Sequence, residues 1–167
     1  QFYRDNRLNA IHEGTHGIQA LDLLGRKVVM QNGAALQLLG KRISATVALA
    51  ADSSHPDTRL FATQLAEYNT RLTKVTQSVW SAGNIDHTLA NATAFLEAFG
   101  HVVVAWMWLE QSLAASKHYA AGESDFYHGK WQACRYFFVA ELPKAGPLLD
   151  LVQQGDTTSF DMQPNWF

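Results

Sequence analysis

The sequence has little cysteine: Cys134 is the one cysteine among 167 residues. A single cysteine excludes a disulfide framework within the chain and a zinc cluster held by several thiolates. Such scarcity is typical of a reducing compartment, and we expect a cytoplasmic protein. The sequence offers Cys134 no base partner. We therefore predict that it is a small buried apolar residue and not a nucleophile.

The sequence also lacks a strong excess of one charge and any long apolar run. Thirteen Lys and Arg stand against fifteen Asp and Glu, a formal charge of -2, which disfavours a nucleic-acid partner. The longest purely apolar run is eight residues, from Val102 to Leu109, whereas a helix that crosses a bilayer needs about 20. We expect no nucleic-acid partner and no membrane span.

The first residues, Gln1 to Asp5, contain neither Met nor the charged-then-apolar pattern of a signal peptide. We expect the chain to be part of a longer polypeptide. Because 47% of its residues are hydrophobic, the chain is predicted to fold as one domain, or one domain with an appendage.

Apolar residues recur at helical spacing along nearly the whole chain, and no alternating run with a hairpin turn indicates a sheet. The expected fold class is all-α, an antiparallel helical bundle with short connections. The clearest pattern predicts a central core helix, with one apolar face made by Leu89, Ala92, Leu96, Phe99, Val103 and Trp106.

Turn and capping residues predict where the helices begin and end. A first helix starts at the N-cap Thr15 and is ended or bent by Gly25. A second follows Asn32-Gly33 with Leu36, Leu39, Ile43 and Val47 on one face, and Pro56 opens a third. Further along, we expect a break at Gly83-Asn84 with Asp86 as the next cap, and a second cap at Ser124 after Gly122. A helix that carries Phe126, Trp131, Cys134 and Phe138 on its apolar stripe should follow and run toward Pro143, with a further break at Gly146-Pro147.

The segment from His12 to His16 fits the zinc-protease pattern H-E-x-x-H. That chemistry needs one helix through all five positions, and Gly14 and Thr15 are poor interior helix formers. We predict instead that the helix starts where the motif ends. Reading Glu13-x-x-His16 as half of a di-iron site requires a second copy, which the sequence lacks. We therefore predict no metal, and a zinc hydrolase is the weaker alternative.

The same region carries a longer pattern: Arg4-Asp5-Asn6-Arg7, then Ile11-His12-Glu13-Gly14-Thr15, then Ile18-Gln19. It resembles the last domain of acyl-CoA dehydrogenases, which has Arg-Asp-x-Arg/Lys, Ile-Tyr-Glu-Gly-Thr, and Ile-Gln opening a helix. The resemblance extends with correct spacing over 25 residues, from Tyr3 to Lys27. One residue departs from the family, since His12 stands where a Tyr is usual.

The resemblance implies roles for four residues. Glu13 would be the base that removes the substrate α-proton, because a carboxylate shielded from water gains basicity. Gly14 would let the substrate approach closely. Thr15 and Gln19 would face the flavin nucleotide. The implied cofactor is FAD, the implied partners are an acyl-CoA substrate and electron-transfer flavoprotein or a similar acceptor, and we expect a homo-oligomer.

The resemblance also implies a division of the chain. Residues 1–31 would end the ordinary C-terminal helical domain, 32–155 would form an appended bundle, and 156–167 would be an irregular tail. Appended helices are typical of a bacterial subgroup similar to methylthiopropionyl-CoA dehydrogenase. The domains that make most flavin and acyl-CoA contacts are not recognisable here, so we predict that the fragment alone is inactive and binds FAD weakly or not at all.

The alternative from another class is a non-enzymatic helical module for interaction or oligomerisation. In that case the Glu-Gly-Thr segment is coincidence, and the apolar residues of the tail contact a partner or a second copy.

Overall fold

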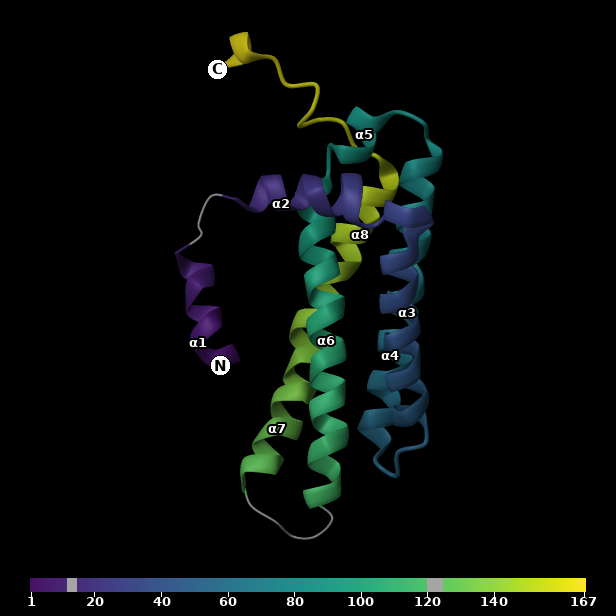
Figure 1. The fold of residues 1–167 in the computed structure, drawn as a ribbon, viewed down its shortest axis with the longest axis vertical. Helices are drawn as coiled ribbons and strands as arrows, with labels where there is room; N and C mark the ends of the chain where they lie inside the picture. The colour runs from purple at the N-terminus through teal and green to yellow at the C-terminus, as the bar shows by residue number, and fades with distance from the viewer. Residues whose placement is uncertain (12–14, 120–124) are drawn as a thin grey trace.

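A computed structural model describes residues 1–11, 15–119 and 125–167, and within these ranges the chain contains helices and turns but no strand. Three long helices, α3 (Met30–Ala51), α4 (Pro56–Ser81) and α6 (Ala92–Tyr119), run alongside α7 (Asp125–Tyr136) and α8 (Ala145–Gln154). Figure 1 shows them as an antiparallel bundle, with α2 (His16–Asp22) crossing near one end. The predicted all-α bundle is confirmed.

The antiparallel pair α3 and α4 forms one side of the bundle. Residues 31–33 have left-handed backbone angles, with φ of 51°, 56° and 77°, so the regular part of α3 follows Asn32-Gly33 as predicted. Its inward face combines buried Ile43 with half-buried Leu36, Leu39 and Val47. Helix α4 begins at Pro56, because proline has no N–H to leave unpaired in a first turn.

Helix α6 is the central core helix, as predicted, and packs against α2, α3, α4, α7 and α8. Its fully buried ridge differs from the predicted face and consists of Phe95, Ala98, Val102, Ala105 and Leu109. Phe99, Val103 and Trp106 are half-buried beside that ridge. The reason is that α6 is apolar on most sides, so its neighbours and not its own pattern decide which residues are enclosed.

Helix α6 is also long and apolar enough to cross a membrane, judged by length and composition alone. It is the one helix of the described residues that passes this test. Its place among five other helices gives another reason for the apolar composition, because a helix enclosed in a bundle is apolar on most sides too.

The short helix α5 (Ile85–Leu89) corrects two predictions. Leu89 belongs to α5 and not to the central helix. The cap is Asn84, whose side-chain oxygen accepts hydrogen bonds from the backbone N–H groups of Asp86 (3.0 Å) and His87 (3.3 Å). Asp86 was the predicted cap, but it lies in the first turn of the helix, where its own N–H is one of the groups that need capping.

The last helices correct two more predictions. Gly146 and Pro147 lie in the first turn of α8 and do not interrupt it, since the first N–H groups of a helix have no partner within the helix. Phe126 of α7 is 64% exposed, whereas Cys134 and Phe138 are buried. From α7 the chain reaches α8 through a π-helical turn, η3 (Phe137–Glu141), and a 3-10 turn, η4 (Leu142–Lys144). Gly122 and Ser124 lie outside the described residues.

Both ends of the chain extend beyond the bundle in Figure 1. At the start, α1 (Phe2–Asp5) and the 3-10 turn η1 (Asn6–Ala10) stand beside it. At the end, the chain leaves α8 at Gly155 and continues into the 3-10 turn η5 (Pro164–Trp166). This tail is held at its base, where the Asn91 side-chain amide donates to the carbonyl of Asp156 at 2.7 Å.

Candidate functional site

Two of the four predicted site residues, Thr15 and Gln19, lie within the described part of the chain. Glu13 and Gly14, and with them His12, lie outside the described residues, so their roles stay predictions. Helix α2 begins at His16, and Thr15 precedes it with φ −98° and ψ 0°. The prediction that the helix starts where the H-E-x-x-H motif ends is therefore confirmed.

Thr15 and Gln19 lie one helical turn apart on one face of α2. The Gln19 side-chain amide donates to the Thr15 hydroxyl at 2.8 Å, and the Gln19 backbone N–H donates to the Thr15 carbonyl at 2.9 Å. Gln19 is exposed, and the neighbouring Ile18 is 70% exposed. The first turn of α2 thus exposes an amide and a large apolar side chain on its surface.

The opposite face of α2 fixes this helix on the bundle. Ala20 and Leu24 are fully buried in the common core. After Asp22 the helix continues as a π-helical turn, η2 (Leu23–Lys27), in which the Val28 N–H bonds to the Leu23 carbonyl. The carbonyl of Leu24 is released by this shift and accepts from the indole N–H of Trp80 at 3.2 Å. The turn therefore ties α2 to α4.

Gly25 explains how closely η2 approaches the bundle. A Cβ at this position would lie 3.3 Å from the Cδ2 atom of Leu89 on α5. Gly25 was predicted to end or bend the helix, but it lies in the middle of the π-helical turn, which begins at Leu23 and continues to Lys27. The exposed face of α2 is consequently presented from a firmly packed support.

A shallow open cleft of about 510 Å³ runs along this exposed face. Gln19 lines it together with Ile18, Asp22, Leu23, Arg26, Lys27 and, from α6, Leu96. The Arg26 side chain donates to the Asp22 carboxylate at 2.5 Å, and this hydrogen bond lowers the pKa of Asp22. Two cations against one anion give the cleft a positive balance, which suits an anionic group of a ligand.

The sequence did not identify Arg26 and Lys27 as candidate site residues. The two basic residues are visible in the sequence near the end of a predicted helix. Basic residues are common there because they interact favourably with the helix dipole, so the pair alone does not indicate a ligand site. Its relation to Gln19 depends on the π-helical turn and on Leu96, which is far away in sequence.

His101 and Cys134 lie away from the exposed face of α2 and contact other residues of the bundle. No group of three His, Cys, Asp or Glu able to hold a metal ion occurs in the ranges that the structure describes. His101 is half-buried, and its Nδ1 lies 2.8 Å from the Glu97 carbonyl. Cys134 is fully buried, and burial raises the pKa of its thiol to about 12 despite a hydrogen bond with Ser112. A thiol with this pKa is not a nucleophile at neutral pH.

Comparison with known proteins shows to which family the chain belongs. Residues 39–163 match the family model described as acetyl-CoA dehydrogenase C-terminal like. The chain is 33% identical over 142 residues to 3-methylmercaptopropionyl-CoA dehydrogenase of Ruegeria pomeroyi, an alignment covering 78% of this chain and 22% of that protein.

Two further relatives align over nearly the whole chain. Butyryl-CoA dehydrogenase of Syntrophomonas wolfei is 28% identical over 98% of this chain and 28% of its own length. The broad-specificity linear acyl-CoA dehydrogenase FadE5 of Mycobacterium tuberculosis is 25% identical over 97% of this chain and 28% of its own length. The chain spans about a quarter of the length of these relatives. It belongs to the acyl-CoA dehydrogenase family, in the helical C-terminal part that the family model describes.

Proposed function

We propose that the chain is the C-terminal part of a flavin-dependent acyl-CoA dehydrogenase and that Glu13 is its catalytic base. One observation supports this most strongly. The Glu13-Gly14-Thr15 motif directly precedes a helix, α2, whose buried face is fixed in the bundle and whose face carrying Gln19 is open. A residue that precedes such a helix can be held against a ligand by a firm support.

The described residues fit a flavin nucleotide. Thr15 and Gln19 place a hydroxyl and an amide at the start of α2, and Arg26 and Lys27 supply positive charge about two turns beyond Gln19. These side chains would hold the polar and anionic parts of FAD. When bound, FAD accepts the hydride that leaves the β-carbon of the substrate.

The task of Glu13 in this proposal is the removal of one proton. The proton on the carbon next to a thioester is only weakly acidic. A carboxylate that removes it must therefore be held against it and shielded from water. Loss of that proton and of the β-hydride gives an α,β-unsaturated acyl-CoA. Gly14 leaves room beside the carboxylate for the acyl chain, because it has no side chain.

We further propose that the 167-residue chain alone is inactive and binds FAD weakly or not at all, because α2 presents one open face of a ligand site and not an enclosed one. The complete enzyme would be cytoplasmic and homo-oligomeric and would pass electrons to electron-transfer flavoprotein or a similar acceptor. Co-purification of one equivalent of flavin with the isolated chain would contradict the first part of this proposal.

The direct test replaces Glu13 by Gln in the longer enzyme. Glutamine has nearly the same shape but cannot take the proton, so anaerobic addition of a substrate acyl-CoA is expected to bleach the flavin at least about 1,000-fold more slowly. Glu67→Gln, an exposed glutamate of α4, is the matched control and should reduce its flavin at the normal rate. Unchanged reduction in Glu13→Gln would remove Glu13 from the mechanism.

A further inference from the structure

A solvent-facing groove with a volume of about 910 Å³ lies between α3 and α4. Val29, Leu36 and Trp80 supply apolar surface, and several amide and hydroxyl side chains also line the groove. The site assigned above does not use this groove.

The charge of the groove is one-sided. Its lining includes two lysines, Lys41 on α3 and Lys74 on α4, and no Asp or Glu among the described residues. The chain as a whole has a charge of -2. An occupant with apolar side chains and negative charge would therefore match both the surface and the potential of the groove.

The tail of this chain has that chemistry. From Thr157 to Phe167 it contains Asp161 and no Lys or Arg. Three of its large apolar side chains are exposed: Met162 by 45%, Trp166 by 64% and Phe167 by 96%. A solvent-facing group of large apolar side chains is typical of an interaction surface.

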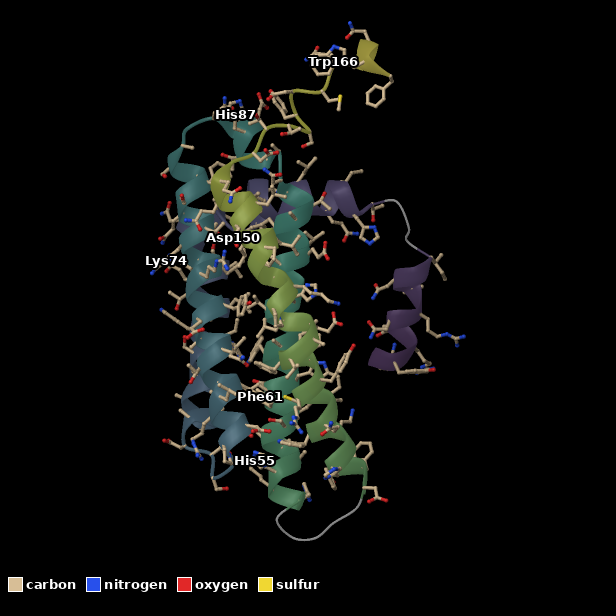
Figure 2. The ribbon with its side chains drawn as sticks, turned by 180° about the vertical axis from the view of Figure 1, so that it is seen from behind. His55, Phe61, Lys74, His87, Asp150 and Trp166 are labelled. Atoms are coloured by element: carbon tan, nitrogen blue, oxygen red, sulfur yellow. The ribbon has the colours of Figure 1, made fainter. Side chains whose placement is uncertain are left out.

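The tail leaves the bundle in an ordered way. Gly155 ends α8 with φ 65°, a left-handed angle that glycine adopts without strain. The Thr157 hydroxyl then donates to the Asp161 carboxylate at 2.6 Å, and Phe160 contacts the ring of His87 at a centroid distance of 5.8 Å. The residues after Phe160 project beyond the end of the bundle, as the position of Trp166 in Figure 2 shows.

The same picture places Lys74 on the α3–α4 side of the bundle and Trp166 beyond the end of the bundle, toward the opposite side. The tail thus points away from the groove of its own copy. We propose that the tail of one copy docks in the α3–α4 groove of a second copy, with Trp166 and Phe167 on the apolar surface and Asp161 facing the two lysines. The exchange is reciprocal, so both tails and both grooves are filled and the pair closes as a twofold dimer. This interface goes beyond the proposed catalytic function and does not depend on it.

Sedimentation velocity over a concentration series of the 167-residue chain tests the interface. We expect a reversible dimer for the natural sequence. The tail variant Trp166→Ser/Phe167→Ser and the groove variant Lys41→Glu/Lys74→Glu should each weaken the dimer by about tenfold or more. Adding Asp161→Lys to the groove variant should restore part of the affinity, because the charges are then complementary again. Raising the salt concentration should weaken the natural dimer.

The matched control is Lys117→Glu/Lys130→Glu, which makes the same charge change on α6 and α7, away from the groove. It should leave the dimer affinity within about threefold of the natural value. Circular dichroism is expected to show the same helical content in all variants, since the changed side chains lie at the surface. A natural chain that stays monomeric, a dimer insensitive to both the tail and groove variants, or a control that weakens the dimer as much as the groove variant would each overturn the proposal.

Discussion

The bundle encloses a core of large apolar residues, whereas the N-terminal segment leaves most of its large apolar side chains exposed. In the bundle, Phe95 and Leu109 of α6 and Phe138 of η3 are almost completely enclosed by neighbouring helices. In the N-terminal segment, Tyr3 is 84% exposed, Ile11 73% and Ile18 70%. The bundle therefore completes its own core, whereas the segment that carries the family motif presents apolar and polar groups that suit a further surface. Stability is expected to reside in the first region and chemistry in the second.

The largest effect should follow from damage to the core of the bundle. Phe95 is fully buried and packs against Phe99 with ring centroids 5.9 Å apart. Phe95→Ala leaves a cavity and is expected to lower the free energy of unfolding by about 3–5 kcal/mol. Val139→Ala, at a position 69% exposed, should change it by less than about 0.5 kcal/mol. Urea denaturation followed by circular dichroism measures both, and equal losses would contradict the assignment of the core.

A pH dependence follows from the buried thiol. Because the pKa of Cys134 is raised from 9.0 to about 12, the folded state keeps the thiol proton at a pH where the unfolded state loses it. The stabilisation is complete below pH 9 and is lost as the pH rises from 9 toward 12, by about 1.4 kcal/mol for each pH unit.

Comparison with Cys134→Ala isolates this effect from the titration of Tyr and Lys. The free energy of unfolding of the natural chain should fall more steeply between pH 9 and pH 10.5 than that of the variant. Parallel slopes for the two proteins would show that the thiol is not buried as described.

The cap of α5 gives a smaller effect. Asn84→Ala removes the acceptor for two backbone N–H groups, and we expect a loss of about 1 kcal/mol in the free energy of unfolding. Asp86→Ala removes only a favourable charge near the helix N-terminus and should cost about 0.3 kcal/mol. Thermal unfolding of the two variants decides between them, and a larger loss for Asp86→Ala would restore Asp86 as the cap.

The smallest effect is expected on the open face of α2. Ile18→Ser and Gln19→Ala change exposed side chains, so each should alter the stability of the isolated chain by less than about 0.5 kcal/mol. In the longer enzyme, Gln19→Ala is expected to increase the rate of FAD loss on dilution. If Gln19 had only a structural role, the rate of FAD loss would not change. A loss of more than about 2 kcal/mol in the isolated chain would mean that this face is part of the core after all.

Much of the fold could be predicted from the sequence, because several signals are local. Proline fixes the start of α4 at Pro56, and the stripe of α3 shows which face is buried. The wrong predictions arose where the outcome depends on distant residues. The buried face of α6 is set by the helices around it, and Phe126 faces solvent, with the Lys130 ammonium 5.5 Å from its ring centroid.

The candidate site divides in the same way. The start of α2 at His16 and the shared face of Thr15 and Gln19 follow from local sequence. The basic pair Arg26-Lys27 is visible in the sequence, but the cleft itself could not be foreseen, since Leu96 joins it from α6. The roles of Glu13 and Gly14 and the division of the chain at residues 31/32 stay predictions.

The most direct test of the central claim is deuterium exchange at the α-carbon of an acyl-CoA analogue that has sulfur in place of the β-carbon and so cannot give up a hydride. Mass spectrometry of the analogue after incubation with the longer enzyme in deuterated water reports proton removal alone. We expect the natural enzyme to incorporate deuterium and Glu13→Gln to incorporate none above the rate without enzyme. Equal incorporation by both would show that Glu13 is not the base.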